Sequence, residues 1–131
     1  MSKSCSVLVV EDDLGVRELL RHVLAEEGNH VEVARNGQEM RAALAARTFN
    51  AVIIDVRLPG GENGIALARQ AEGRGCAVIL ITGDYNHAEA LAATGYRYLL
   101  KPFRVERLLE VTEEAVELAN ASCRIRRRRI T

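Results

Sequence analysis

Short, uninterrupted apolar runs constrain the fold of this 131-residue chain more than any other feature of its sequence. Residues 7–10, 51–54 and 77–81 carry only apolar side chains, many of them β-branched. Such runs are typical of strands that are buried on both faces, as in a parallel sheet. Residues 31–33 alternate between apolar and charged side chains, which suits an edge strand, and we expect a fifth strand over residues 96–100.

Helical patterns lie between these runs. Apolar residues recur at the spacing of one helix face from Val16 to Leu24, with Asp13 placed to cap the start of this helix and Gly28 placed to end it. Alternating strands and helices predict an α/β fold, a doubly wound five-stranded parallel sheet with helices on both faces. We expect four further helices: around residues 40–44, over residues 63–68, over residues 86–93 with a short, weak pattern, and over residues 105–119.

Composition excludes several classes of protein. Equal numbers of basic and acidic residues, 18 of each, argue against a uniformly basic nucleic-acid-binding protein. No apolar run approaches the roughly 20 residues of a membrane span, and acidic residues 11–13 interrupt the N-terminal segment where a signal peptide would need a longer apolar stretch. Cys5, Cys76 and Cys123 are widely spaced, which argues against disulfides and a zinc site. We therefore expect a cytoplasmic protein that does not span a membrane.

Polar residues follow the expected strands at the points where the strands end. They are three consecutive acidic residues after the first strand (Glu11, Asp12 and Asp13) and one residue at the end of each of three later strands (Asp55, Thr82 and Lys101). Because the carboxyl ends of parallel strands share one edge of a sheet, we expect these side chains to meet there.

The chemistry of this set suits phosphoryl transfer. Clustered carboxylates suit Mg²⁺, which prefers oxygen ligands, and a lysine ammonium is a point-charge partner for phosphate. An aspartate carboxylate can also act as a nucleophile and form an aspartyl phosphate. The set therefore predicts a Mg²⁺-dependent aspartyl-phosphorylation site. Taken alone, Asp12 and Asp13 could merely cap the helix that follows them.

The order and spacing of these residues resemble the receiver domain of two-component response regulators. The resemblance implies the flavodoxin-like strand order 2-1-3-4-5 and a phosphorylation-switched signalling module, with no enzymatic activity on other substrates. The matching segments are residues 7–13 (VLVVEDD), 52–59 (VIIDVRLP), 81–83 (ITG) and 100–103 (LKPF).

The resemblance also implies roles for the site residues. Asp55 would accept the phosphoryl group from a sensor histidine kinase or a histidine phosphotransfer protein. Asp12, Asp13 and Asp55 would hold Mg²⁺ together with the backbone carbonyl of Arg57. Arg57 and Asp84 occupy positions that tune autodephosphorylation in the family.

Other roles concern the phosphoryl group and the switch. Lys101 would pair with the phosphoryl oxygens, and its bond to Pro102 would be the family's cis peptide. Thr82 would move to hydrogen-bond the phosphoryl group. Tyr98, three residues before Lys101, would turn inward as Thr82 moves.

The sequence departs from the common family pattern in three places. The loop after Asp55, over residues 59–64, is one residue longer than the commonest form. The interval from Thr82 to Lys101 is a few residues short, which leaves open whether the fourth helix, fifth strand and fifth helix form the signalling face. Nothing but an Arg-rich stretch follows the last helix, so we expect a stand-alone receiver domain over residues 1–121 and a tail over residues 122–131.

The tail carries five arginines between residues 124 and 129. These could contact phosphate backbones or an acidic partner. They could equally form the solvated end of the last helix, where cations complement the helix dipole. We favour the solvated end because no aromatic residues interleave with the arginines for base stacking.

Two other functions stay open beside the phosphoacceptor role. One is a Mg²⁺-dependent phosphatase or phosphotransferase with an aspartate nucleophile. Such enzymes usually place the nucleophile after the first strand with a second Asp two residues on, and residues 11–14 lack that pattern. The other is an unphosphorylated scaffold, which the complete set of site residues disfavours. The downstream protein partner and a homodimer also stay open.

Overall fold

The computed structural model describes the backbone of residues 5–84, 86 and 88–130, and side chains within these ranges as far as residue 119. Its strands are β1 (Ser6–Val10), β2 (His30–Ala34), β3 (Ala51–Asp55), β4 (Ala77–Thr82) and β5 (Arg97–Leu100). They form one parallel sheet in the order β2-β1-β3-β4-β5. This order confirms the doubly wound arrangement expected from the sequence.

Burial of the strands follows their place in the sheet. Every residue of β3 and β4 is buried, as is every residue of β1 except Ser6. In β2, at an edge of the sheet, only Ala34 is buried. The central strands are continuous apolar runs because both of their faces are covered, whereas the edge strand is less buried and carries polar residues among its apolar ones.

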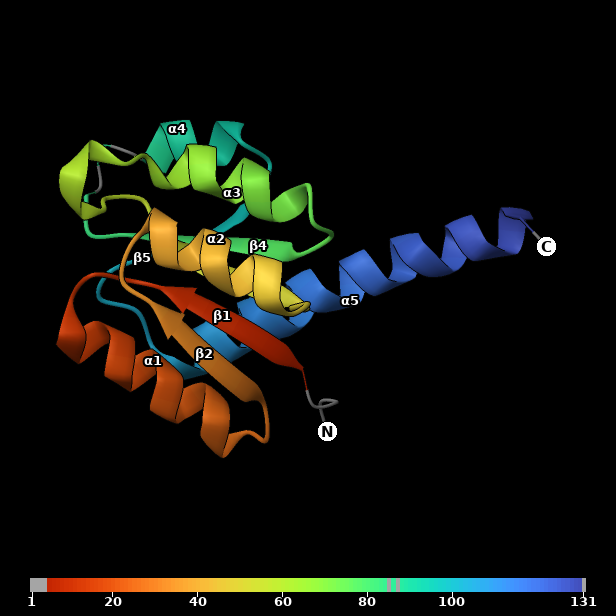
Figure 1. Ribbon diagram of the computed structural model, residues 1–131, viewed down its shortest axis with the longest axis horizontal. Coiled ribbons are helices and arrows are strands. Elements are labelled where there is room, and N and C mark those ends of the chain that lie inside the picture. Colours follow the sequence, from red (N-terminus) through yellow and green to blue (C-terminus); the bar gives the residue numbers. More distant parts are fainter. Residues whose placement is uncertain (1–4, 85, 87, 131) are drawn as a thin grey trace.

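Helices pack on both faces of the sheet (Figure 1). They are α1 (Leu14–Glu26), α2 (Gly37–Ala46), α3 (Gly64–Glu72), α4 (Ala88–Ala93) and α5 (Val105–Ile130), with a short 3₁₀ turn η1 (Pro59–Gly61) before α3. Met40, Leu67 and Leu91 bring α2, α3 and α4 into the core on one face. Leu20 and Leu108 bring α1 and α5 into the core on the other.

The first helix begins and ends where the sequence indicates. The Asp13 carboxylate accepts a hydrogen bond from the Val16 N–H at 2.9 Å, which caps the exposed N-terminal amides of α1. Glu27 is the C-cap, and Gly28 follows it with a φ of 91°. Glycine adopts this left-handed conformation without the steric cost that a Cβ would bring.

The last two helices depart most from average length. α4 contains only six residues, in keeping with its weak sequence pattern. α5 is longer than expected: its backbone stays helical to Ile130, and Figure 1 shows it extending beyond the sheet. The helix therefore continues through the Arg-rich segment, whose side chains lie outside the described residues. The division at residue 121 stays a prediction.

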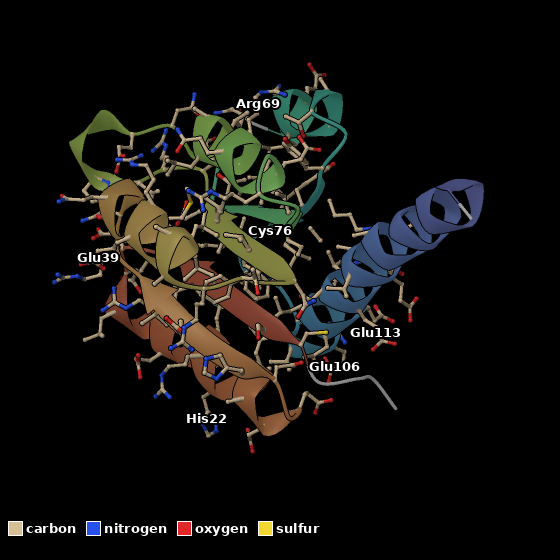
Figure 2. The ribbon with its side chains drawn as sticks, turned by 45° about the vertical axis from the view of Figure 1, so that its right-hand side comes forward. His22, Glu39, Arg69, Cys76, Glu106 and Glu113 are labelled. Carbon is tan, nitrogen blue, oxygen red and sulfur yellow. The ribbon has the colours of Figure 1, made fainter. Side chains whose placement is uncertain are left out.

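Polar side chains gather on the outside of the fold and apolar ones inside it. Figure 2 shows His22 and Glu39 on the surface of α1 and α2, while Cys76 lies between the sheet and the helices that cover it. Burial raises the pKa of the Cys76 thiol, as expected of a small core residue. Across the described ranges, none of the helices has the length and apolar character that crossing a membrane requires.

Two adjacent leucines of α1 test this assignment of core and surface. Leu20 is fully buried, whereas Leu19 is 50% exposed. We expect Leu20→Ala to lower the free energy of unfolding by about 2–5 kcal/mol, because it leaves a cavity beneath the sheet. Leu19→Ala should change it by about 0.5 kcal/mol or less. Urea denaturation of both variants measures the difference, and equal losses would contradict the packing described here.

Candidate functional site

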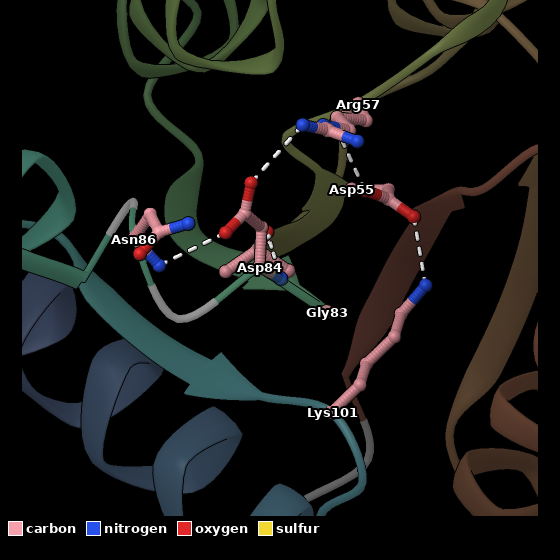
Figure 3. Close-up of a pocket in the computed structure, with 7 residues that line it drawn as sticks. Asp55, Arg57, Gly83, Asp84, Asn86 and Lys101 are labelled. Atoms are coloured by element: carbon pink, nitrogen blue, oxygen red, sulfur yellow. Dashed lines mark hydrogen bonds and ion pairs between the residues drawn. The ribbon is translucent and has the colours of Figure 1, made fainter.

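The candidate site lies at the carboxyl edge of the sheet. Parallel pairing puts Val10 in register with Ile54, and Thr82 in register with Leu100. The residues that end or follow these strands therefore emerge side by side. An open pocket at this edge, drawn in Figure 3, is lined by Asp55, Arg57, Thr82, Gly83, Asp84, Asn86 and Lys101.

Lys101 bridges two carboxylates that the sheet brings together. Its Nζ donates to Asp55 Oδ2 at 2.8 Å and to Glu11 Oε1 at 2.9 Å. The side chains of Lys101, Asp55 and Glu11 are 25%, 9% and 2% exposed. Two bare carboxylates would repel each other in such a poorly solvated place, so the ammonium is what allows both to be buried.

For both Glu11 and Lys101, burial and the ion pair between them have opposing effects on the pKa. Burial raises the pKa of the Glu11 carboxyl; the Lys101 hydrogen bond opposes that rise, and the nearby Asp55 adds to it. Burial would lower the pKa of the Lys101 ammonium, but its bonds to Asp55 and Glu11 outweigh burial and raise it. Lys101 therefore stays protonated at neutral pH.

Glu11 belongs to the acidic set expected at this edge, but the family resemblance gave it no role there. Its backbone N–H donates to the Ala34 carbonyl at 3.0 Å, so Glu11 continues the ladder between β1 and β2. The register shows why it meets Asp55. Val10 pairs with Ile54, so the residues after them, Glu11 and Asp55, end neighbouring strands at the same level.

The two aspartates expected to hold a metal lie in different surroundings. Asp13 Oδ2 caps α1, and the Asp13 N–H donates to Glu11 Oε2 at 3.1 Å. The side chain of Asp12 is exposed. The structure therefore brings Glu11, rather than Asp13, to Asp55 and Lys101, and it shows Asp13 in the capping role that the sequence had offered as the simpler alternative.

An ion pair between Arg57 and Asp84 joins the loops that follow β3 and β4 (Figure 3). Arg57 Nη2 donates to Asp84 Oδ2 at 3.0 Å. The Asp84 N–H donates to Thr82 Oγ1 at 3.1 Å, and the Arg57 N–H donates to Asp55 Oδ1 at 2.9 Å. The buried Thr82 hydroxyl, the Arg57 guanidinium and the Asp55 carboxylate thus belong to one hydrogen-bonded network.

The remaining expected residues lie on β5 or directly after it. The peptide bond between Lys101 and Pro102 is cis, the isomer that the family resemblance implies. Tyr98 is partly buried against the core formed with α2, α3 and α4. It pairs with Leu80, two residues before Thr82, so alternation along the strands places Tyr98 and Thr82 on the same face of the sheet.

The donors at this edge match Mg²⁺ in chemistry. Glu11 and Asp55 offer carboxylate oxygens, which hard divalent cations prefer, and Asp12 offers another from the adjoining loop. Within the described ranges, no three His, Cys, Asp or Glu side chains are already gathered as a metal cluster. The Lys101 ammonium instead supplies the positive charge between Glu11 and Asp55.

Replacing Lys101 by methionine tests this charge balance. Lys101→Met leaves two buried carboxylates without their cation, and we expect the free energy of unfolding at pH 7 to fall by about 3 kcal/mol. The Lys101 hydrogen bond opposes the rise that burial causes in the pKa of the Glu11 carboxyl, so its loss raises that pKa further and Glu11 should gain a proton as the pH falls. The deficit relative to wild type should therefore be smaller near pH 5 than at pH 7. Urea denaturation in EDTA measures it, and a deficit that does not vary with pH would contradict this balance.

Solved structures of other proteins share this fold. The crystal structure of NtrX from Brucella abortus aligns with a TM-score of 0.88 and 28% identity, over 97% of this chain and 30% of NtrX. The response regulator TrrA from Thermotoga maritima, crystallised with Mg²⁺-BeF, aligns with a TM-score of 0.74 and 28% identity, over 84% of this chain and 97% of TrrA.

Sequence relatives are response regulators with longer chains. The aerobic respiration control protein ArcA of Escherichia coli is 36% identical over 78% of this chain and 44% of its own length. Response regulator MprA of Mycobacterium tuberculosis is 36% identical over 81% of this chain and 48% of its own length. The DNA-binding transcriptional regulator NtrC of Salmonella typhimurium is 34% identical over 84% of this chain and 24% of its own length. The chain thus spans between about a quarter and a half of these relatives.

A family profile covers most of the chain. The profile described as the response regulator receiver domain matches residues 7–113, which include β2 to β5, all of β1 except Ser6, and the residues of the carboxyl edge. Together with the sheet order and the convergence of Glu11, Asp55 and Lys101, this match identifies the chain as a member of the response regulator receiver domain family.

Proposed function

We propose that Asp55 is the phosphoacceptor of this receiver domain. The observation that carries the proposal is the placement of the Lys101 ammonium 2.8 Å from Asp55 Oδ2, at the edge of a pocket open to a donor. In the transfer, a carboxylate oxygen of Asp55 attacks the phosphorus of a phosphohistidine. The new O–P bond forms as the P–N bond breaks, and the released imidazole takes up a proton.

Lys101 and the backbone around Asp55 prepare this reaction. The ammonium neutralises negative charge on the incoming phosphoryl group, which needs positioning and charge compensation more than covalent help. The Arg57 N–H, which donates to Asp55 Oδ1, fixes the orientation of the carboxylate. The partner that supplies the phosphoryl group would be a sensor histidine kinase or a histidine phosphotransfer protein.

Mg²⁺ would be held by Asp55, by Asp12 and by the backbone carbonyl of Arg57, with Glu11 as the second acidic residue of the site. Asp13 is a weaker candidate than the sequence implied, because its carboxylate already caps α1. When bound, the cation would offset charge on the phosphoryl oxygens. The Mg²⁺-BeF complex of TrrA, a protein of the same fold, supports a Mg²⁺ site in this chain.

Thr82 and Tyr98 would carry the signal away from Asp55. A phosphoryl group adds about two negative charges and strong acceptor oxygens, to which the Thr82 hydroxyl can donate. Movement of Thr82 would free space on the face that it shares with Tyr98. The output would then be binding to another protein, or transfer of the phosphoryl group in a relay.

The proposal is tested by the intact mass of the protein after incubation with acetyl phosphate. We expect one added phosphoryl group, which requires both Mg²⁺ and Asp55 and is absent from Asp55→Asn. A protein that gains no mass and binds no Mg²⁺ would contradict the proposal and favour the scaffold alternative. Steady Mg²⁺-dependent phosphate release without an adduct would have two explanations, rapid autodephosphorylation of a receiver or hydrolysis by a phosphatase. Trapping with beryllofluoride separates them, because a receiver site should bind it.

The Arg57–Asp84 ion pair generates a second prediction, about the lifetime of the phosphoryl group. Arg57→Ala removes a guanidinium that lines the pocket and pairs with Asp84. We expect the aspartyl phosphate to hydrolyse several-fold faster, because water reaches the pocket more freely. Salt screens an exposed pair, so added salt should shorten the wild-type lifetime and leave that of Arg57→Ala unchanged. Mass spectrometry after removal of the donor measures the decay, and identical lifetimes would contradict a shielding role.

A further inference from the structure

The loop between β3 and α3 is held at both of its ends. At its base, Arg57 and Asn63 form an isolated antiparallel bridge, and the Gly64 N–H donates to the Val56 carbonyl at 3.0 Å. A Cβ at Gly64 would overlap the Asp55 backbone carbonyl, so the end of the loop is pressed against the candidate phosphoacceptor. Any shift of this segment is therefore transmitted directly to Asp55.

The tip of the loop, by contrast, has few restraints of its own. Gly60 and Gly61 both adopt left-handed φ values, 78° and 76°, and both are exposed. Consecutive glycines have the largest conformational freedom to lose on folding. A loop that is one residue longer than the commonest form and carries such a tip needs a side-chain contact with another element to keep one conformation.

Glu62 supplies that contact with α2. Its Oε1 accepts from the Gly37 N–H at 2.8 Å, and its Oε2 lies 3.6 Å from Arg41 Nη2. Gly37 is the first residue of α2, where a free backbone N–H and the helix dipole both favour a carboxylate. A Cβ at Gly37 would overlap the Glu62 carboxylate, so a larger residue there would require the carboxylate to move from this position.

We propose that Glu62 is a positioning residue for the phosphorylation site, acting by clamping the β3–α3 loop onto the start of α2. Glu62 directly precedes Asn63, whose backbone pairs with Arg57. The clamp thereby holds the Arg57 carbonyl and the Asp55 carboxylate in the arrangement that binds Mg²⁺ and accepts the phosphoryl group. This inference rests on the proposed function of Asp55.

The test compares Mg²⁺ affinity and phosphorylation rate in four single variants and one double variant. Glu62→Ala should weaken Mg²⁺ binding about tenfold, the low end of the range for residues that orient metal ligands, and slow labelling by acetyl phosphate at limiting Mg²⁺. Glu62→Gln keeps an acceptor for the Gly37 N–H and should restore most of the affinity. Glu39→Ala is the matched control, since it removes a carboxylate from the same helix end but one that pairs with Arg35.

Gly37→Ala gives the sharpest readout because its effect should depend on Glu62. In the wild type, the added Cβ displaces the Glu62 carboxylate, so Mg²⁺ affinity should fall as in Glu62→Ala. In the Glu62→Ala background, the Cβ has room, so affinity should not fall further. There the resistance to urea should rise, because alanine is a better helix former than glycine. Calorimetric titration with Mg²⁺ and urea denaturation measure the two effects.

The outcomes separate this inference from the proposed function. Wild type that is not phosphorylated would overturn both. Wild type that is phosphorylated, with Glu62→Ala matching it in Mg²⁺ affinity and labelling rate, would overturn the clamp alone. Equal losses in Glu62→Ala and Glu39→Ala would also overturn it, because a general loss of charge or stability at α2 would then explain them. Loss confined to Glu62→Ala and Gly37→Ala supports it.

Discussion

The bridge from Lys101 to Asp55 and Glu11 is the interaction on which the carboxyl edge depends. The three residues lie far apart in the sequence and meet only because three strands of one parallel sheet end at the same level. Burying two carboxylates together is unfavourable unless a cation sits between them. The ammonium that allows both carboxylates to be buried is therefore the same group that would neutralise charge on an incoming phosphoryl group.

The buried central strands of the sheet fix the positions of the site side chains. β3 and β4 are buried at every residue, and Asp55, Arg57, Thr82 and Asp84 are attached to their last residues or to the loops that follow. The loops are in turn joined to one another through Arg57 and Asp84, and to α2 through Glu62. The sheet fixes where each chain segment ends, and a few side-chain contacts fix the direction in which each loop leaves.

The parts of the molecule that the sequence predicted are those with a periodic signal. Continuous apolar runs located the strands, and strands ending in polar residues located Asp55, Thr82 and Lys101 at one edge. No such period distinguishes Glu11, Asp12 and Asp13, which are consecutive and acidic. Their fates differ because Glu11 still pairs with β2 through its backbone, whereas Asp13 has left the strand and caps a helix.

Contacts between loops escaped prediction for a related reason. The approach of Glu62 to Gly37 depends on how a glycine-rich loop folds back over 25 residues of sequence, and neither residue carries a local pattern that points to the other. The length of α5 was also underestimated, because the apolar stripe stops near Ala119 while the arginines beyond it are themselves good helix formers. Helix propensity can continue an element after the tertiary signal has ended.

The negative charge that the proposed transfer would add to this edge calls for a metal ion. Before transfer, Glu11 and Asp55 face one ammonium. After transfer, an acyl phosphate of about two negative charges would replace the Asp55 carboxylate, with Glu11 and Asp12 close by and only Lys101 opposing them. The local excess would be about three negative charges, which a site of low dielectric does not tolerate without a further cation. One divalent ion removes most of that excess, so the acidic residues that make phosphorylation costly are also those that would recruit the ion.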